Sequence, residues 1–233
     1  RFYDNRPARV AEFRVLSDGT EIELTAAAYA YERSPLMERV TKTVTAAGSG
    51  QEQTSVEETY GEAAAYPYAA GQTKFTRDIA GVETFYDYEA AEEHGAAHKK
   101  TAVTKVGGEL AAGQSRKTES FLAANGTVLF EQESVWDGDN WLPLSSGAHE
   151  YDEEGRRTKT TRGNGRVTST SWMCCGKLSE TDEDGILTSY GYNSAHQLVE
   201  TIRSEISDGD TVVTPETITT YTRDAAGRAL QTR

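Results

Sequence analysis

The stretch DEDGILTSYGYN, residues 182–193, joins a turn signal to a strand signal. Acidic residues next to glycine are typical of tight turns, because glycine tolerates positive φ and aspartate accepts hydrogen bonds from nearby backbone groups. After Gly185, β-branched and aromatic residues occupy alternate positions as far as Tyr192, and this period of two predicts a strand. A segment that begins at Asp78 aligns with this stretch without a gap. The chain therefore uses one turn-and-strand unit more than once.

Turn glycines recur at a regular spacing in the second half of the chain. Gly155, Gly165, Gly176 and Gly185 follow one another at intervals of 9 to 11 residues, and His196 stands where the next glycine would fall. Strands of about six to eight residues joined by short turns fit each interval. The spacing therefore predicts consecutive antiparallel hairpins, with two strands in each full repeat.

Two segments interrupt this regularity. Gly227 comes later than the spacing predicts, and the acidic turn signal at residues 207–210 predicts an insertion of about half a repeat. Residues 89–100, rich in Ala and Glu, are interpreted as an expanded loop between strands. The predicted fold class is all-β, with antiparallel hairpin repeats that form a solenoid-like sheet or a shell segment.

Composition limits the classes of function. The formal net charge of −13 argues against a nucleic-acid partner, whose phosphates the chain would repel. No run approaches the ~20 apolar residues of a membrane span, so membrane insertion is not expected. The apolar share of 36% fits a sheet wetted on one face, which needs apolar residues at alternate positions only. The first residues carry no signal-peptide pattern, and we expect an excised segment of a longer protein.

Histidines and acidic turns offer metal ligands in incomplete sets. His94 and His98 lie four residues apart, a spacing that places two ligands on one helical face, but no third ligand is evident. The acidic turns at residues 137–139, 182–184 and 208–210 do not complete the set of about six oxygen ligands that calcium requires. Turn chemistry and a solvated loop explain these residues, and no metal is expected.

Cys174 and Cys175 are the two cysteines of the chain, and they are adjacent. Two small residues in a turn, a redox switch with a vicinal disulfide, and half of a zinc site are the alternatives. Because a second cysteine pair is missing, zinc is not expected. No nucleophile elbow, phosphate-binding loop or dinucleotide fingerprint occurs, so the chain is not expected to be an enzyme or to bind a cofactor.

The sequence YDEEGR, residues 151–156, and the unit that follows it as far as Leu198 resemble the YD-repeat (RHS-repeat) family. The family's unit reads approximately Y-D-x-x-G-R-L, then a short strand, D-x-x-G, a threonine and the next tyrosines. Trp172, Asn193 and His196 depart from this pattern. The matching residues are expected to be structural: Asp78, Gly81, Tyr86, Tyr88, Tyr151, Asp152, Gly155, Arg156, Gly176, Asp182, Gly185, Tyr190, Tyr192, Tyr221, Asp224, Gly227 and Arg228.

The resemblance implies a secreted or cell-surface bacterial protein in which a long β-ribbon forms a shell. In polymorphic toxins of this family, the shell encloses a C-terminal toxic domain. Residues 76–233 are expected to be the repeat region, and residues 1–75 a degenerate or divergent β-rich part of it. The partners would be neighbouring repeats of the same parent chain and an enclosed toxin domain. The alternative is a carbohydrate-binding or adhesion module that presents an aromatic-rich sheet face to a glycan.

Overall fold

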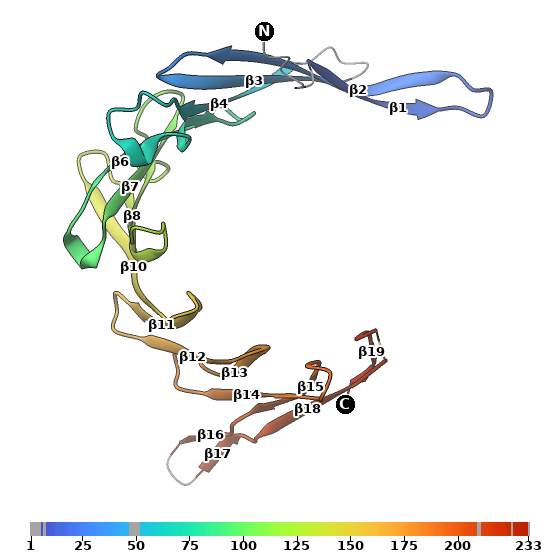
Figure 1. Cartoon of the computed structure of the whole chain (residues 1–233), viewed down its shortest axis with the longest axis vertical. Helices are drawn as coiled ribbons and strands as arrows, with labels where there is room; N and C mark the ends of the chain where they lie inside the picture. The colour runs from blue at the N-terminus through green and yellow to red at the C-terminus, as the bar shows by residue number, and fades with distance from the viewer. Residues whose placement is uncertain (1–5, 7, 47–51, 209–210, 225, 233) are drawn as a thin grey trace. The chain divides into compact units, whose positions relative to one another are not determined.

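β-Strands are the main secondary structure in the computed structural model, which describes residues 6, 8–46, 52–208, 211–224 and 226–232 (Figure 1). Of the strands in these ranges, seventeen belong to one sheet, and β16 (Ile206–Asp208) pairs with β17 (Thr211–Thr214) in a separate hairpin. Neighbouring strands pair in the antiparallel sense. The predicted all-β, antiparallel fold is therefore confirmed. Within the described ranges, no helix is long and apolar enough to cross a membrane.

Two compact units divide the chain, and the hairpin of β9 (Val128–Trp136) and β10 (Trp141–Tyr151) contributes to both. The first unit holds residues 1–126 and 132–144, and the second holds residues 127–131 and 145–233. The first unit contains β1 (Arg9–Val15), β2 (Glu21–Arg33), β3 (Met37–Ala46), β4 (Glu52–Tyr60), β5 (Thr73–Arg77), β6 (Val82–Ala90), β7 (His98–Val106) and β8 (Arg116–Leu122). The second contains β11 (Arg157–Arg162), β12 (Val167–Met173), β13 (Gly176–Thr181), β14 (Leu187–Tyr192), β15 (Leu198–Arg203), β18 (Thr217–Arg223) and β19 (Ala229–Thr232), with β16 and β17. The predicted boundary at residue 75 rests on repeat content and stays a prediction.

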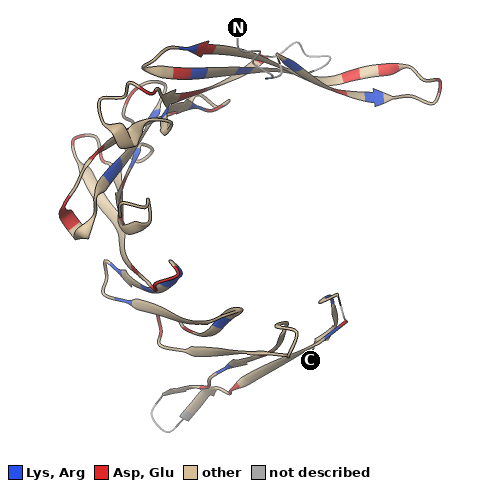
Figure 2. Ribbon diagram, in the orientation of Figure 1, with Lys and Arg blue, Asp and Glu red and all other residues tan. Residues whose placement is uncertain are grey.

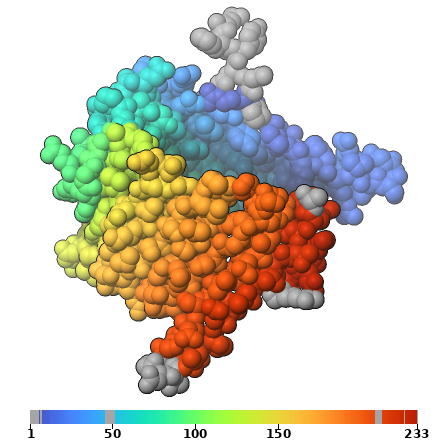
Figure 3. Space-filling model, turned by 60° about the horizontal axis from the view of Figure 1, so that its bottom comes forward, coloured from blue at the N-terminus to red at the C-terminus, as the bar shows by residue number. Residues whose placement is uncertain are grey.

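Consecutive hairpins occupy the second unit, as the glycine spacing predicts. In the space-filling view, successive segments of this unit lie next to one another, from orange to red (Figure 3). Gly155, Gly165 and Gly185 lie in turns with φ of 77°, 82° and 82°, which is the left-handed region that favours glycine. Gly176 does not lie in a turn. Cys174 and Cys175 connect β12 to β13, and Gly176 is the first residue of β13.

The insertion and the expanded loop both differ from their predicted form. β15 pairs directly with β18, from Glu200 opposite Thr220 to Arg203 opposite Thr217, so the inserted β16–β17 hairpin adds no strand to the main sheet. Gly209 and Asp210, part of the predicted turn at 207–210, lie outside the described residues. The loop predicted over residues 89–100 covers residues 91–97, with a 3-10 turn, η2 (Glu93–Gly95); the flanking residues continue β6 and begin β7.

Few apolar side chains are buried. In the described residues they are Ala69, Tyr88, Ala96, Phe121 and Leu122, and all of them belong to the first unit. There the loop that carries a second 3-10 turn, η1 (Pro67–Ala69), and the loop at residues 91–97 supply buried residues beside the strands. Among the described residues, nineteen large apolar side chains are exposed, from Val10 to Leu230. In much of both units, the sheet therefore has no second layer of structure packed against it.

Candidate functional site

A five-residue turn recurs with one set of hydrogen bonds. In the turn that begins at Asp152, the N–H of Asp152 donates to the carbonyl of Arg156 at 3.0 Å, and the N–H of Gly155 donates to the carbonyl of Asp152 at 3.0 Å. The Oδ1 atom of Asp152 accepts from the N–H groups of Glu154 and Arg156, at 3.1 and 2.8 Å. The side chain thereby satisfies two backbone donors of the turn. The same four bonds occur in the turns that begin at Asp78, Asp182, Asn193 and Asp224.

The fourth residue of each turn has positive φ. Gly81, Gly155, Gly185 and Gly227 have φ between 77° and 82°, and His196, in the turn that begins at Asn193, has φ of 59°. His196 therefore has the same kind of backbone conformation as the four turn glycines, as the glycine spacing predicts. A histidine with positive φ is uncommon, because its Cβ crowds the backbone in this region. Asn193 replaces aspartate without loss of the turn, since its side-chain oxygen accepts the same bonds.

Arginine after the turn glycine binds its own turn. The Nε of Arg156 donates to Oδ2 of Asp152 at 2.7 Å, and the Nε of Arg228 donates to Oδ2 of Asp224 at 2.7 Å. Hydrogen bonds from the backbone N–H of Arg228, and then from its side chain, hold the pKa of Asp224 below its ordinary value. Each arginine therefore pairs with the carboxylate of its own turn, which the turn places within hydrogen-bond reach.

Aromatic residues at strand ends donate to neighbouring backbone. The hydroxyl of Tyr151 donates to the carbonyl of Val128 at 2.8 Å, and that of Tyr192 donates to the carbonyl of Lys177 at 2.9 Å. The indole Nε1 of Trp172 donates to the carbonyl of Arg157 at 2.9 Å, so this departure from the tyrosine pattern keeps the same kind of bond. The strand register shifts at each of these aromatic residues. The aromatic side chains therefore hydrogen-bond to a neighbouring strand or turn at the points where the regular strand pairing is interrupted.

Alternate turns lie at the same end of the strands, because consecutive strands run in opposite directions. The turns at residues 152–156, 174–175, 193–197 and 224–228 form one such row, and we call this side of the sheet the tyrosine edge. Along it, bonds to backbone carbonyls join one turn region to the next. Besides the Tyr192 bond, Arg156 Nη1 donates to the carbonyl of Met173 at 3.1 Å, and Arg223 Nε donates to the carbonyl of Leu198 at 2.6 Å. Arg223 stands where a tyrosine would precede the turn, and its guanidinium lies 5.5 Å from the Tyr221 ring centre.

The opposite edge, which we call the charged edge, is joined by ion pairs instead. It includes the turns at residues 162–166 and 182–186. Arg162 pairs with Glu183 at 2.9 Å, and Arg166 pairs with Asp184 at 3.1 Å. Arg203, at the end of β15, also pairs with Asp182 at 3.2 Å. Basic and acidic residues are interspersed along the strands of both units, which makes such pairing available throughout (Figure 2).

Gly176 lies where the backbone approaches an aromatic ring. A Cβ atom built at Gly176 would lie 2.5 Å from Oη and 2.8 Å from Cζ of Tyr192, distances that real Cβ contacts do not show. The absence of a side chain at residue 176 therefore lets the Tyr192 hydroxyl reach the carbonyl of Lys177. The repeat spacing predicted Gly176 in a turn, whereas in the structure its role is to make room for the Tyr192 ring.

Tyr190 and Tyr192 lie on one face of β14 and engage their hydroxyls within the sheet. The Tyr190 hydroxyl lies 3.3 Å from Oε2 of Glu180, which also pairs with Lys177 at 2.6 Å. Burial, and then the charge of Glu180, raises the pKa of Tyr190. Both side chains are half-buried. These contacts are those of residues that hold neighbouring strands together.

Tyr88, which aligns with Tyr192, belongs to an aromatic cluster of the first unit. The ring of Tyr88 is buried and lies edge-on to Tyr60 and Tyr68, with centroid distances of 6.0 and 6.2 Å. Burial raises the pKa of Tyr88 to about 12. The hydroxyl of Tyr60, the last residue of β4, donates to the carbonyl of Tyr86 at 3.0 Å. The strand-end aromatic bond therefore occurs in both units.

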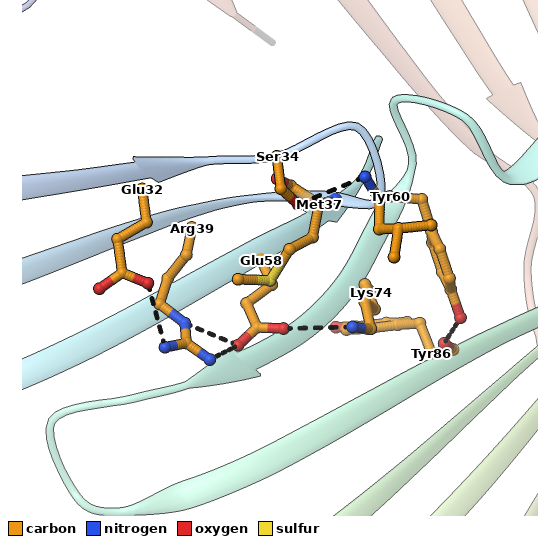
Figure 4. A network of polar contacts seen from close by, with 9 residues as sticks. Glu32, Ser34, Met37, Arg39, Glu58, Tyr60, Lys74 and Tyr86 are labelled. Carbon is orange, nitrogen blue, oxygen red and sulfur yellow. Dashed lines mark hydrogen bonds and ion pairs between the residues drawn. The ribbon is translucent and has the colours of Figure 1, made fainter. Parts of the chain in front are cut away.

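A network of charged side chains lies on the sheet of the first unit (Figure 4). Arg39 donates to Oε1 of the buried Glu58 from Nε at 2.8 Å and from Nη2 at 2.5 Å, and it also pairs with Glu32. Lys74 Nζ lies 3.6 Å from the other Glu58 oxygen. An open groove of about 530 Å³ is lined by Arg39, Glu58 and Lys74 of this network and by the ring pair of Phe75 and Phe85. The charge of Glu58 is thus already matched by two cations, which fits a structural role.

The predicted metal candidates engage in other contacts. His94 has φ of 56°, and its ring lies 4.9 Å from Phe121, whereas the ring of His98 stacks on Tyr68 at 3.7 Å. Asp137 uses Oδ1 to accept from the N–H groups of residues 139 and 140, at 2.8 and 2.7 Å. Among the described residues, the group that brings metal-ligand atoms together is Cys174, Cys175 and His196. The sequence did not predict this group, because His196 lies in a different turn from the cysteines and strand pairing brings the two turns together.

Comparison with known proteins assigns no family. No family model matches the chain, and no curated protein matches it. Among solved structures, a crystal structure of TcdB2-TccC3 without its hypervariable C-terminal region is similar, with 15% identity and a TM-score of 0.47. The similarity covers 93% of this chain and 12% of that chain. A likeness of this size assigns neither a family nor an activity to this protein.

Proposed function

We propose that this chain is a non-catalytic structural segment of a bacterial YD/RHS-repeat protein, and that it builds part of a β-shell. The observation that carries the proposal is the recurrent turn. The first side chain holds the turn, positive φ at the fourth residue closes it, and bonds along the tyrosine edge join it to the next. Each unit therefore stabilises its neighbours, which is how repeat arrays are held together.

The exposed apolar side chains are consistent with a segment that packs against further repeats of its parent chain. Val15, Ile218 and Leu230 are among the large apolar residues that are exposed in the part of the chain that the structure describes. In the proposed parent protein, neighbouring repeats of the same chain would cover part of this surface, and the shell would enclose a C-terminal toxin or effector domain. We place this protein outside the cell or at the bacterial surface.

Electron microscopy of the parent chain tests the proposal. The expected result is a closed β-shell in which this segment forms part of the wall, with flanking repeats paired to β1 and β19. A segment that lies outside the shell as a separate domain would refute the proposal.

The carbohydrate-binding alternative makes a different prediction about the tyrosines. Tyr190→Ala and Tyr192→Ala should lower the melting temperature, because both side chains are half-buried and bonded within the sheet. A glycan-array screen of the same variants and of the wild type is the matched measurement. Unchanged melting together with loss of a wild-type glycan signal would replace the shell with a binding module.

A further inference from the structure

The two cysteines and one histidine form a cluster on the tyrosine edge. Cys174 and Cys175 occupy the turn between β12 and β13, and their Sγ atoms lie 2.7 Å apart as free thiols. His196 lies in the turn between β14 and β15. The two Sγ atoms and a ring nitrogen of His196 all lie within 4.8 Å of one another, and the three residues are exposed.

The sheet itself brings these turns together. The turn that holds the cysteines and the turn that holds His196 are alternate turns of one antiparallel series, so they are neighbours along the same edge. Tyr192 helps to hold the two turns together. It lies at the end of β14, and its hydroxyl donates to the carbonyl of Lys177, next to the cysteine turn. The cluster is therefore built on strand pairing and does not depend on one flexible loop.

The histidine occupies a position that elsewhere in the chain holds glycine. The equivalent residues are Gly81, Gly155, Gly185 and Gly227, and their φ values of 77° to 82° are free of side-chain crowding. The turn uses the backbone of His196, whose N–H donates to the carbonyl of Asn193 at 2.9 Å. The imidazole is not required for the turn. Its presence at a conformationally unfavourable position places a nitrogen ligand beside two sulfur ligands.

We propose that Cys174, Cys175 and His196 form a binding site for a thiophilic divalent cation of the zinc class. Two sulfurs and one imidazole nitrogen match the ligands that zinc prefers, and three protein ligands leave the fourth tetrahedral position open to water or to an outside ligand. On binding, both thiols become thiolates and release their two protons to solvent, so the bound cation and its ligands carry no net charge. The excess of acidic residues in the chain also favours the approach of cations.

The geometry requires a small adjustment of the thiols. With zinc–sulfur distances of about 2.3 Å in a tetrahedral arrangement, two sulfurs lie roughly 3.8 Å apart. The sulfurs must therefore separate by about 1 Å from the 2.7 Å that the structure shows. Rotation about the Cα–Cβ bonds of two exposed side chains supplies this movement without a change in the strands.

Metal titration of the reduced protein tests the site. Zn²⁺ should displace a chromogenic chelator at one ion per chain, and Co²⁺ should give thiolate-to-metal absorption in the near ultraviolet. Binding to the folded state should raise the melting temperature by roughly 5–10 °C when free Zn²⁺ is about 100 times the dissociation constant. Absence of one-to-one Zn²⁺ binding to the reduced wild type would overturn the proposal.

His196→Gly is the decisive variant, because it restores the residue that the equivalent turns use. It should lower Zn²⁺ affinity at least tenfold, while the metal-free protein keeps or raises its melting temperature, since glycine suits positive φ. Cys174→Ser and Cys175→Ser should each abolish the thiolate absorption of the Co²⁺ form at one-to-one stoichiometry. His94→Gly, which replaces another histidine with positive φ outside the cluster, is the matched control and should leave binding unchanged. Equal Zn²⁺ affinity of His196→Gly and the wild type would refute the site.

Discussion

Gly176→Ala tests how the tyrosine edge is held together. The new Cβ would meet the Tyr192 ring at 2.5 to 2.8 Å, so the ring must move, and its hydroxyl then loses the carbonyl of Lys177. The backbone of residue 176 lies in a strand, and alanine is compatible with it. The destabilisation therefore has one structural cause, which is the displacement of Tyr192.

The expected change in the free energy of unfolding is the sum of two destabilising contributions and one stabilising contribution. Loss of the hydroxyl bond destabilises the fold by about 0.5–1.5 kcal/mol. Partial exposure of the half-buried ring adds roughly 1 kcal/mol. Replacement of glycine restricts the unfolded chain and stabilises by ~0.4–1 kcal/mol. Gly176→Ala should therefore lower the free energy of unfolding by about 0.5–2 kcal/mol, which corresponds to a loss of roughly 1–8 °C in melting temperature.

Urea unfolding of a double-mutant cycle provides the assay, with fluorescence of the nearby Trp172 as one probe. Tyr192→Phe should destabilise the wild type by about 1 kcal/mol but should have little further effect in the Gly176→Ala background, because the hydroxyl bond is already lost. Gly147→Ala is the control, since a Cβ at this strand glycine would meet no atom closer than 3.4 Å. Unchanged stability of Gly176→Ala, or an equal effect of Tyr192→Phe in both backgrounds, would refute the reasoning.

Three further predictions concern acid, salt and association. Burial, and then the charge of Arg157, lowers the pKa of the buried His149 imidazole below 6.5. The unfolded chain therefore takes up this proton more readily, and stability should fall as the pH drops below about 6.5; the melting temperature of His149→Gln should fall less between pH 7 and pH 5. Glu183→Gln removes an exposed ion pair of the charged edge and should destabilise by less than about 1 kcal/mol, an effect that should vanish in concentrated NaCl. Phe13 in β1 and Leu230 in β19 are exposed, so the protein should self-associate in ultracentrifugation, and Phe13→Lys with Leu230→Lys should reduce that association.

The fold and the turns could be predicted because their determinants are local. Asp182 and Gly185 form their turn with each other and with the three residues around them, so the sequence of one unit is sufficient. The position of His196 could be predicted in the same way, because the spacing places it at the fourth residue of a turn, where φ is positive.

The remaining features depend on neighbours that are distant in sequence. Gly176 fits the glycine spacing, but the residue that explains it, Tyr192, is two strands away. The cysteine–histidine cluster likewise requires two turns that only strand pairing makes adjacent. A regular spacing can indicate which turns share an edge, yet it does not show which side chains meet there.

The hairpin of β16 and β17 shows that this sheet accepts additions at a turn. β15 and β18 pair across it through four residue pairs, as they would if a short turn joined them. Extra chain at this point leaves the register of the main sheet intact, because the two pairing strands enter and leave the insertion at the same edge. A foreign sequence, such as an epitope tag or a small folded domain, can therefore be grafted between Asp208 and Thr211 with the main pairing preserved. By the same route, a repeat protein of this kind can acquire new surface modules without redesign of its framework.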